Sequence, residues 1–306
     1  VGVVFAETLA LSEAGVQRRG SRIEATLMWQ ALAPVQNEYA AILTLQTPGG
    51  LILAQTETPY DTTFTTSSWA PGVWVLEHLL LSVPPGTAPG EYRLAVSLFS
   101  AQTGQTASAV IADGQPAGQS VMLTTLILPR PARPARQDEI GLPVPQNVVG
   151  DGTIGLAGLL VSPVSGEAGQ PVVLDWAWEA QRQPDLAYSV RALWLSSAGE
   201  IAAQSGPYPL NRMLAADFWR RGDLWRDRQL MLIPGVLDAG EYQLALELVD
   251  EKETAMGERG VVARMTVGAP ERSYAMPPFA HKASLEWTNG ITLPGYDSGD
   301  GVLTLY

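Results

Sequence analysis

The sequence repeats itself at an interval of about 150 residues, and this repeat limits the fold more than any other feature. Trp29-Gln30-Ala31 recurs as Trp178-Glu179-Ala180, and Gly90-Glu91-Tyr92 recurs as Gly240-Glu241-Tyr242. Matching motifs in one order at a nearly constant spacing indicate repeated structural units rather than chance. We therefore expect both halves of the chain to share one fold.

A third copy of the repeat begins near the end of the sequence. The motif Ile154-Gly-Leu-Ala-Gly158 recurs as Ile291-Thr-Leu-Pro-Gly295, and Leu303-Thr-Leu-Tyr306 corresponds to Ala25-Thr-Leu-Met-Trp29. We interpret residues 268–306 as a connector and the first strands of a truncated third copy, cut from a longer protein. In the alternative interpretation, residues 285–306 close the second copy.

Each copy has the pattern of an all-β fold. Short runs of β-forming residues alternate with Gly- and Pro-rich turns such as Thr47-Pro-Gly-Gly50. Tyr92, Leu94, Val96 and Leu98 recur at every second position, the period of a strand with one buried face. About seven such strands in each copy predict tandem immunoglobulin-like antiparallel β-sandwiches. Copy two also contains a predicted short helix, whose apolar residues at helical spacing are Leu210, Met213, Leu214 and Phe218.

The domain boundaries follow from the repeat and from a proline-rich segment. We predict immunoglobulin-like sandwiches at residues 1–128 and 151–267, joined by a Pro/Arg-rich linker at residues 129–150. The linker opens with Pro129-Arg-Pro-Ala-Arg-Pro-Ala-Arg136, and prolines at this density favour an extended, semi-rigid spacer. We expect this spacer to form few hydrogen bonds to either domain. Its arginines fit a solvated linker better than a phosphate or anionic-lipid contact.

Composition argues against several classes of partner and chemistry. The formal net charge is −12, which argues against nucleic acid, because nucleic-acid binding depends on neutralising phosphates. The chain has no cysteine, which removes disulfides, thiolate nucleophiles and cysteine-ligated metals. The sequence has no run of 18 apolar residues, so we predict no membrane insertion by this segment. We expect no cofactor.

Acidic residues that recur in both copies suggest structural roles rather than catalysis. Glu77 aligns with Asp227, and Glu91 aligns with Glu241. Paired acids are the machinery of glycoside hydrolases, but two adjacent domains rarely carry the same active site. We therefore expect these acids to be structural, with Glu91 and Glu241 capping the turn before a strand. We predict no catalytic residue.

The two histidines and a C-terminal acidic turn do not predict a metal site. Neither His78 nor His281 has another histidine at ligand spacing. The segment Asp297-Ser-Gly-Asp-Gly301 has clustered oxygen ligands but lacks the third carboxylate and the terminal acid of a calcium loop. We interpret this segment as a hairpin turn.

The nine tryptophans fall into a core group and a loop group. Trp29 and Trp178 recur in strand sequences, so we expect them to pack between the sheets. Trp69 and Trp219 recur beside glycines, so we expect them to close one end of each sandwich. Other aromatic residues in turn-rich segments are candidates to stack against sugar faces, or to pack against the sandwich. These candidate ligand-contact residues are Tyr60, Trp74, Tyr208 and Trp225.

Several motifs together resemble those of a known family. They are Trp29-Gln-Ala-Leu-Ala-Pro34, Trp69-Ala-Pro-Gly72, and Val83-Pro-Pro-Gly86 followed by Pro89-Gly-Glu-Tyr-Arg-Leu94. The chain resembles the repeated β-sandwich modules at the C-termini of bacterial (Chloroflexi-type) dolichyl-phosphate-mannose-mannosyltransferase-like membrane glycosyltransferases, and of related envelope proteins. The resemblance covers most of copy one and the framework of copy two, where Trp219-Arg-Arg-Gly222 lacks the proline. Catalytic residues of that family lie in its membrane part, so none is carried over.

The resemblance implies an extracytoplasmic location in the cell envelope, within a membrane-anchored parent protein. It also implies an accessory role, with other domains of the parent chain, envelope proteins or a glycan as partners. We therefore predict a non-catalytic interaction module. The alternatives are a carbohydrate-binding module that uses the loop aromatics and, less favoured, an enzyme of the glycoside hydrolase type.

Overall fold

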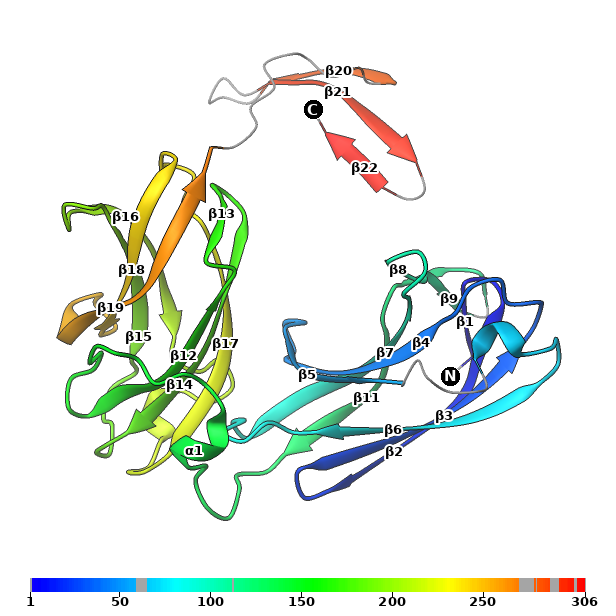
Figure 1. Ribbon diagram of the computed structural model, residues 1–306, viewed down its shortest axis with the longest axis horizontal. Coiled ribbons are helices and arrows are strands. Elements are labelled where there is room, and N and C mark those ends of the chain that lie inside the picture. Colours follow the sequence, from blue (N-terminus) through cyan, green and yellow to red (C-terminus); the bar gives the residue numbers. More distant parts are fainter. Residues whose placement is uncertain are drawn as a thin grey trace. The chain divides into compact units, whose positions relative to one another are not determined.

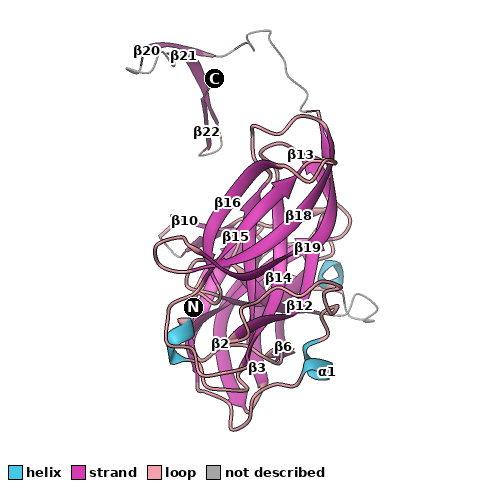
Figure 2. Ribbon diagram, turned by 90° about the vertical axis from the view of Figure 1, so that its left-hand side faces the viewer, coloured by secondary structure: helices cyan, strands magenta, loops and turns pink. Residues whose placement is uncertain are grey.

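The fold is built almost entirely from β-strands (Figures 1 and 2). The chain divides into two compact units, Val1–Gly268 and Ala269–Tyr306. The first unit contains two β-sandwiches, named here sandwich one (residues 2–128) and sandwich two (residues 149–268). The prediction of an all-β fold is confirmed. The computed structural model describes residues 2–58, 65–111, 113–269, 278, 280–286, 292–299 and 302–305.

Sandwich one packs two antiparallel sheets around one core. One sheet has the strand order β10-β9-β1-β2-β3-β6, and the other has the order β11-β7-β4-β5, with β8 beside β7. Both sheets contribute to the core, which includes Phe5, Trp29, Leu43 and Leu94. The elements are β1 (Val3–Phe5), β2 (Leu9–Arg19), β3 (Arg22–Ala31), β4 (Ala40–Gln46), β5 (Ile52–Glu57), the 3₁₀ turn η1 (Thr66–Ser68), β6 (Trp74–Ser82), β7 (Gly90–Ser100), β8 (Gln105–Thr106), β9 (Ala109–Ile111), β10 (Pro116–Gly118) and β11 (Val121–Leu128).

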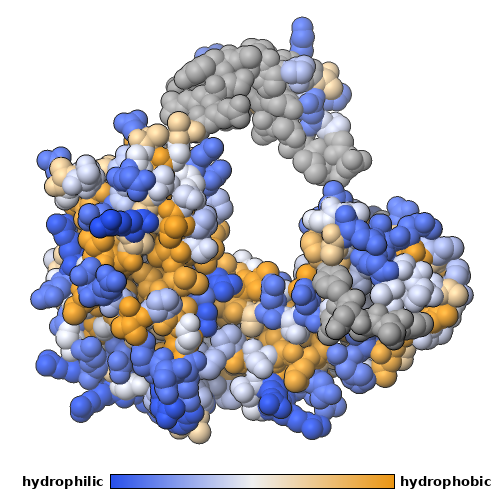
Figure 3. All heavy atoms as spheres, in the orientation of Figure 1, coloured by the Kyte–Doolittle hydropathy of each residue, from blue (hydrophilic) through white to orange (hydrophobic). Residues whose placement is uncertain are grey.

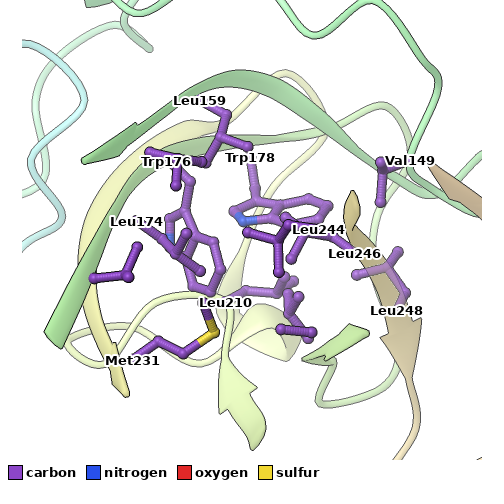
Figure 4. Packing of buried hydrophobic residues seen from close by; sticks show 14 of the residues in the cluster. Val149, Leu159, Leu174, Trp176, Trp178, Leu210, Met231, Leu244, Leu246 and Leu248 are labelled. Carbon is purple, nitrogen blue, oxygen red and sulfur yellow. The ribbon is translucent and has the colours of Figure 1, made fainter. Parts of the chain in front are cut away.

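Sandwich two repeats this plan with a smaller first sheet. Its sheets have the orders β12-β14-β17 and β13-β19-β18-β15-β16. Trp176 and Trp178 project from β14 into a core that leucines of β18 complete from the opposite sheet (Figure 4). The elements are β12 (Ile154–Ser162), β13 (Ser165–Glu167), β14 (Pro171–Ala180), β15 (Ser189–Leu195), β16 (Ile201–Pro209), the 3₁₀ turn η2 (Ala216–Phe218), β17 (Leu224–Leu232), β18 (Gly240–Val249) and β19 (Ala255–Gly268).

The sequence repeat corresponds to a repeat in strand pairing. In sandwich one, β3 pairs with β6 so that Leu27 lies opposite Glu77. In sandwich two, β14 pairs with β17 so that Trp176 lies opposite Asp227. The two pairs are related by the same offsets as the motifs, so the paired strands share one register. Trp29 and Trp178 are buried on equivalent strands, as predicted.

The Gly-Glu-Tyr motif closes a turn in both sandwiches through its tyrosine. Strands β7 and β18 begin at the glycine of the motif. The Tyr92 hydroxyl donates a hydrogen bond to the backbone oxygen of Ala88 (2.8 Å), and the Tyr242 hydroxyl donates to that of Asp238 (3.1 Å). The prediction that the acids cap these turns is corrected: Glu91 and Glu241 are exposed residues inside the strands.

The predicted helix in copy two is not formed. Strand β16 continues to Pro209, and the Asn211 side chain then accepts hydrogen bonds from the backbone N–H groups of Met213 (2.9 Å) and Leu214 (3.1 Å). A side chain that bonds the backbone in this way competes with helix formation. The segment ends in η2, which matches η1 of sandwich one.

The proline-rich connector, residues 129–148, is bonded to sandwich two, and the prediction of few hydrogen bonds is wrong. Arg130 forms an ion pair with Asp223, with 2.5 Å between Nη1 and Oδ2, and donates to the backbone oxygen of Phe218. Asp223 is only 4% exposed. A buried carboxylate requires a charged partner, which explains why the Arg130 side chain is held against sandwich two.

The second half of the connector is held by apolar packing. It forms one helical turn, α1 (Gln137–Ile140), which ends at Gly141 in the left-handed conformation. Ile140 and Leu142 pack against Ala177 and Leu224 of sandwich two. The proline content favours an extended chain, but these two apolar side chains supply contact area that a solvated linker would leave exposed.

The second unit holds an antiparallel sheet of the order β20-β21-β22. Its strands are β20 (His281–Glu286), β21 (Thr292–Gly299) and β22 (Val302–Leu305). Asp297, Ser298 and Gly299 pair with Thr304, Leu303 and Val302, the antiparallel pairing of the predicted hairpin, whereas residues 300 and 301 lie outside the described residues. Over the described residues, the sheet that holds Trp178 consists of β12, β14 and β17. Residues 302–305 pair with β21 inside the second unit, and the copy of the repeat to which they belong stays a prediction.

The two tyrosine bonds generate a matched prediction. Tyr92→Phe should lower the free energy of unfolding by about 1–3 kcal/mol, because it leaves the oxygen of the buried Ala88 without its partner. Tyr242→Phe should cost under ~0.5 kcal/mol, because its bond is exposed. Chemical denaturation of both variants measures the difference. Equal losses would contradict the role of the Tyr92 bond.

Candidate functional site

The three candidate ligand-contact aromatics that the structure describes do not form one surface. Trp74 is 55% exposed, whereas Trp225 is 1% exposed and belongs to the core of sandwich two. Tyr208 is partly buried and packs against that same core. Tyr60 lies outside the described residues.

Trp74 and Trp225 lie in strands rather than in turns, which corrects their predicted setting. At the offset of 150 residues, Trp225 corresponds to Val75, so the two tryptophans are one position out of phase. Successive strand residues point to opposite faces of a sheet, so one step in sequence turns a side chain from core to surface. Trp225 therefore faces inward. The guanidinium carbon of Arg130 lies 5.3 Å from the centroid of the Trp225 ring.

The other tryptophans that the structure describes are core residues, and Trp287 lies outside the described residues. Trp69 is 8% exposed and Trp219 is 0% exposed, so both are buried. Their role in closing one end of each sandwich stays a prediction. The Trp219 indole N–H donates to the backbone oxygen of Leu214 (2.9 Å). Trp194 is also fully buried.

Glu77 and Asp227 occupy matching strand positions and accept hydrogen bonds from the protein itself. Glu77 accepts the Trp29 indole N–H, with 2.7 Å between Nε1 and Oε2, and the Thr58 hydroxyl. Asp227 accepts the backbone N–H groups of Arg212 (2.9 Å) and Arg228 (2.8 Å). Burial raises the pKa of both carboxyls, and these hydrogen bonds oppose that rise.

A charged cluster that sequence reasoning missed lies on the outer face of sandwich two. Asp175 is 4% exposed and accepts two hydrogen bonds from Arg226, at 2.7 Å from Nε and 2.6 Å from Nη2. Arg228 donates a third at 3.0 Å. The signal in the sequence was the charged run Arg226-Asp227-Arg228 inside a strand pattern, where alternation places both arginines on one face.

This cluster also contacts sandwich one. Arg228 Nη1 donates to the backbone oxygen of Ile52 (2.7 Å), and the backbone N–H of Arg226 donates to the oxygen of Gly86 (2.7 Å). Thr87 forms an isolated parallel β-bridge with Arg226. We name this set of contacts the joint: Ile52, Gly86 and Thr87 on sandwich one, with Asp175, Arg226 and Arg228 on sandwich two.

The joint is close-packed at Gly86. This residue has a φ of +80°, and a side chain there would begin 2.7 Å from Ile140 Cδ1 and 3.3 Å from the backbone nitrogen of Arg226. Glycine is therefore required both by conformation and by close approach. Nearby, Met213 packs against the cores of both sandwiches.

The rest of the described chain adds few chemical groups. In residues 2–58, 65–111, 113–269 and the described part of the second unit, no three His, Asp or Glu side chains form a metal-binding group. The helices of this same part are each too short or too polar for a bilayer span. His281 stacks on Tyr296, with ring centroids 4.8 Å apart.

Comparison with models of protein families and with curated proteins found no match for this chain.

The raised pKa of the half-buried Glu77 carboxyl leads to a prediction of pH dependence. Its folded-state pKa lies above the ordinary value of 4.5, so its contribution to stability is complete below that value and declines as pH rises through the folded pKa. Glu77→Gln removes the ionisation and should gain stability relative to wild type as pH rises. Chemical denaturation from acid to neutral pH measures this difference, with exposed Glu91→Gln as the control. A difference independent of pH would contradict the argument.

Proposed function

We propose that this chain is a non-catalytic, extracytoplasmic spacer and interaction module of a bacterial envelope protein or membrane glycosyltransferase-like protein. It consists of immunoglobulin-like sandwiches whose orientation is fixed by the joint. The observation that carries the proposal is the sharing of Arg226 and Arg228 between Asp175 and the backbone of sandwich one. A linker that serves only as a tether requires no such contacts.

The energetics of the joint favour one fixed arrangement. A buried ion pair contributes little net stability, but removal of one partner costs about 3–5 kcal/mol, since the other charge is left unpaired. Arg226 binds Asp175 through two parallel N–H···O bonds, a geometry that sets direction as well as distance. Rotation of one sandwich against the other would break the backbone bonds to Ile52 and Gly86.

The buried acids support a structural role. Asp175, Asp223 and Asp227 are each at most 4% exposed. Each of them accepts hydrogen bonds from arginine side chains or backbone N–H groups, as Glu77 does from Trp29. A glycoside hydrolase needs two carboxyl groups that face one substrate, whereas these oxygens are directed at groups of the protein itself.

The proposed location and partners rest on the motif resemblance. The motifs that carry it include Val83-Pro-Pro-Gly86, which supplies the turn of the joint. In a membrane-anchored parent, the partners would be neighbouring domains of that chain or other envelope proteins. The function would be to hold these domains at a set spacing.

A fixed spacing predicts a narrow distance distribution between the sandwiches. The chain has no cysteine, so a thiol-reactive spin label attaches only to cysteines that are introduced. The variant Thr103→Cys, Glu200→Cys places one label at an exposed position of each sandwich. Electron–electron double resonance should give one narrow distribution of distances between the two labels. Gly86→Ala should broaden or shift it, because the added methyl group meets Ile140 and Arg226.

Gly72→Ala is the matched control for that experiment. Gly72 has a similar φ of +86°, but a side chain there meets no atom within 4 Å. Both substitutions carry the backbone strain of a left-handed residue, and only Gly86→Ala disturbs the joint. A broad distribution in the otherwise unaltered chain would overturn the spacer function.

The exposed Trp74 favours carbohydrate binding as a second candidate function. Its ring is 55% exposed on β6, beside Leu76 at 52%, so it offers an aromatic face to a sugar. Under this alternative, glycan-array binding should fall at least about tenfold in Trp74→Ala, which corresponds to about 1.4 kcal/mol. Phe218→Ala, which removes a 66% exposed aromatic ring elsewhere, is the control. An array without any bound glycan, or equal effects of both variants, would exclude this candidate.

A further inference from the structure

A cavity of about 510 Å³ lies where sandwich one meets the start of the connector. Its walls come from three segments: the turn between β2 and β3, the 83–87 turn that belongs to the joint, and residues 129–135 of the connector. Figure 1 draws the β2–β3 turn and the connector at the lower edge of the first unit, and Figure 3 shows strongly hydrophilic residues along that edge. Small-molecule ligands occupy cavities of roughly 300–1,000 Å³, so this one has the size of a binding site.

Hydrogen bonds hold the walls of the cavity in place. The backbone N–H of Val83 donates to the oxygen of Ser21 (2.7 Å), which joins the β2–β3 turn to the 83–87 turn. In the connector, the Arg133 guanidinium donates to both carboxylate oxygens of Glu139, at 2.8 and 2.6 Å. The cavity is therefore formed without a ligand, which lowers the entropic cost of binding one.

Proline rings form much of the apolar surface of the cavity. They come from both the joint turn and the connector, and they are Pro84, Pro85, Pro129, Pro131 and Pro134. Proline rings pack well on aromatic rings, as they do where proline-rich segments dock on aromatic grooves. Proline also lacks a backbone N–H, so these walls offer few hydrogen-bond donors. The lining therefore favours a ligand whose body is a flat, apolar ring.

One cation at the cavity has no counter-charge. The connector arginines that line it are paired with acids of the protein, as Arg130 is with Asp223. Arg18 is exposed and has no ion-pair partner among the described residues; its Nη1 donates to the backbone oxygen of Gly20 (2.7 Å). The other N–H groups of Arg18 are available to a carboxylate, the group with which a guanidinium forms strong paired hydrogen bonds. The charge of the lining thus favours an anionic ligand.

We propose that this cavity binds a small aromatic carboxylate. The ring lies among the prolines, and the carboxylate accepts hydrogen bonds from the Arg18 guanidinium. Such a ligand contacts sandwich one and the connector together, and Arg130 bonds the connector to sandwich two. The site goes beyond the spacer function and does not depend on it, because binding is measured directly.

Three probes separate the contribution of the ring from that of the charge. Naphthylacetate has both, naphthylacetamide keeps the ring without the charge, and acetate has the charge alone. Isothermal titration calorimetry of the unaltered chain at neutral pH should show saturable one-to-one binding of naphthylacetate. Its Kd should be lower than that of either other probe by about tenfold, the effect of a hydrogen bond to a charged group. No binding of naphthylacetate at millimolar concentration, or equal binding of the acid and the amide, would overturn the proposal.

A charge variant tests the role of Arg18. Arg18→Gln should raise the Kd of naphthylacetate about tenfold and leave that of naphthylacetamide unchanged. Arg19→Gln is the matched control, since Arg19 is the next residue of β2, is also exposed and does not line the cavity. Both variants change the net charge by the same amount. Equal losses of affinity would assign the effect to net charge and overturn the proposal.

A second pair of variants tests the position of the ring. Ala132→Trp places a large side chain in the cavity from an exposed position of the connector, and it should abolish binding of naphthylacetate. Ala101→Trp, in an exposed turn of sandwich one away from the cavity lining, should bind like the unaltered chain. Unchanged binding in Ala132→Trp would place the ligand elsewhere and overturn the proposal.

Discussion

The buried charge of Asp175 is the constraint on which the arrangement of the first unit depends. A carboxylate at 4% exposure must be paired, and here Arg226 and Arg228 pair with it from the adjacent strand. Once these guanidinium groups are held, their remaining donors are directed outward, and Arg228 binds the backbone of Ile52 in sandwich one. The same arginines thus neutralise Asp175 in sandwich two and form the contact with sandwich one. Gly86 completes it because its lack of a side chain admits the backbone of Arg226.

One register supports different surfaces in the two sandwiches. Thr26 and His78 in sandwich one lie opposite each other as Asp175 and Arg228 do in sandwich two. The inner face keeps apolar residues and one acid in both sandwiches, although side-chain sizes differ, as in Leu27 against Trp176. The outer face is not restricted by core packing, so an ion cluster can stand where the other copy has a threonine and a histidine. Interaction surfaces can therefore change while the strand pairing remains the same.

The repeat and the strand alternation were sufficient to predict the all-β fold and the burial of Trp29 and Trp178. Local patterns were less reliable where tertiary contacts compete. The prolines of the connector indicated a solvated spacer, but Arg130 forms an ion pair with the buried Asp223 and so holds the connector against sandwich two. The helical spacing after Pro209 was overridden by the Asn211 side chain, which bonds the following backbone. The joint could not be predicted, because its contacts link residues 52 and 86 to residues 228 and 226, and no local period encodes that proximity.

The two sandwiches also differ in the hydrogen bonds of their central indoles. In sandwich one, Glu77 is long enough to accept the Trp29 indole N–H. Asp227 is one methylene shorter and bonds backbone N–H groups instead, and within the described chain the Trp178 indole N–H is buried without a partner. Such a group costs about 1–3 kcal/mol. Sandwich two has this unpaired group and also a smaller first sheet. The apolar contacts of Ile140 and Leu142 therefore contribute to the stability of sandwich two as well as to its link with sandwich one.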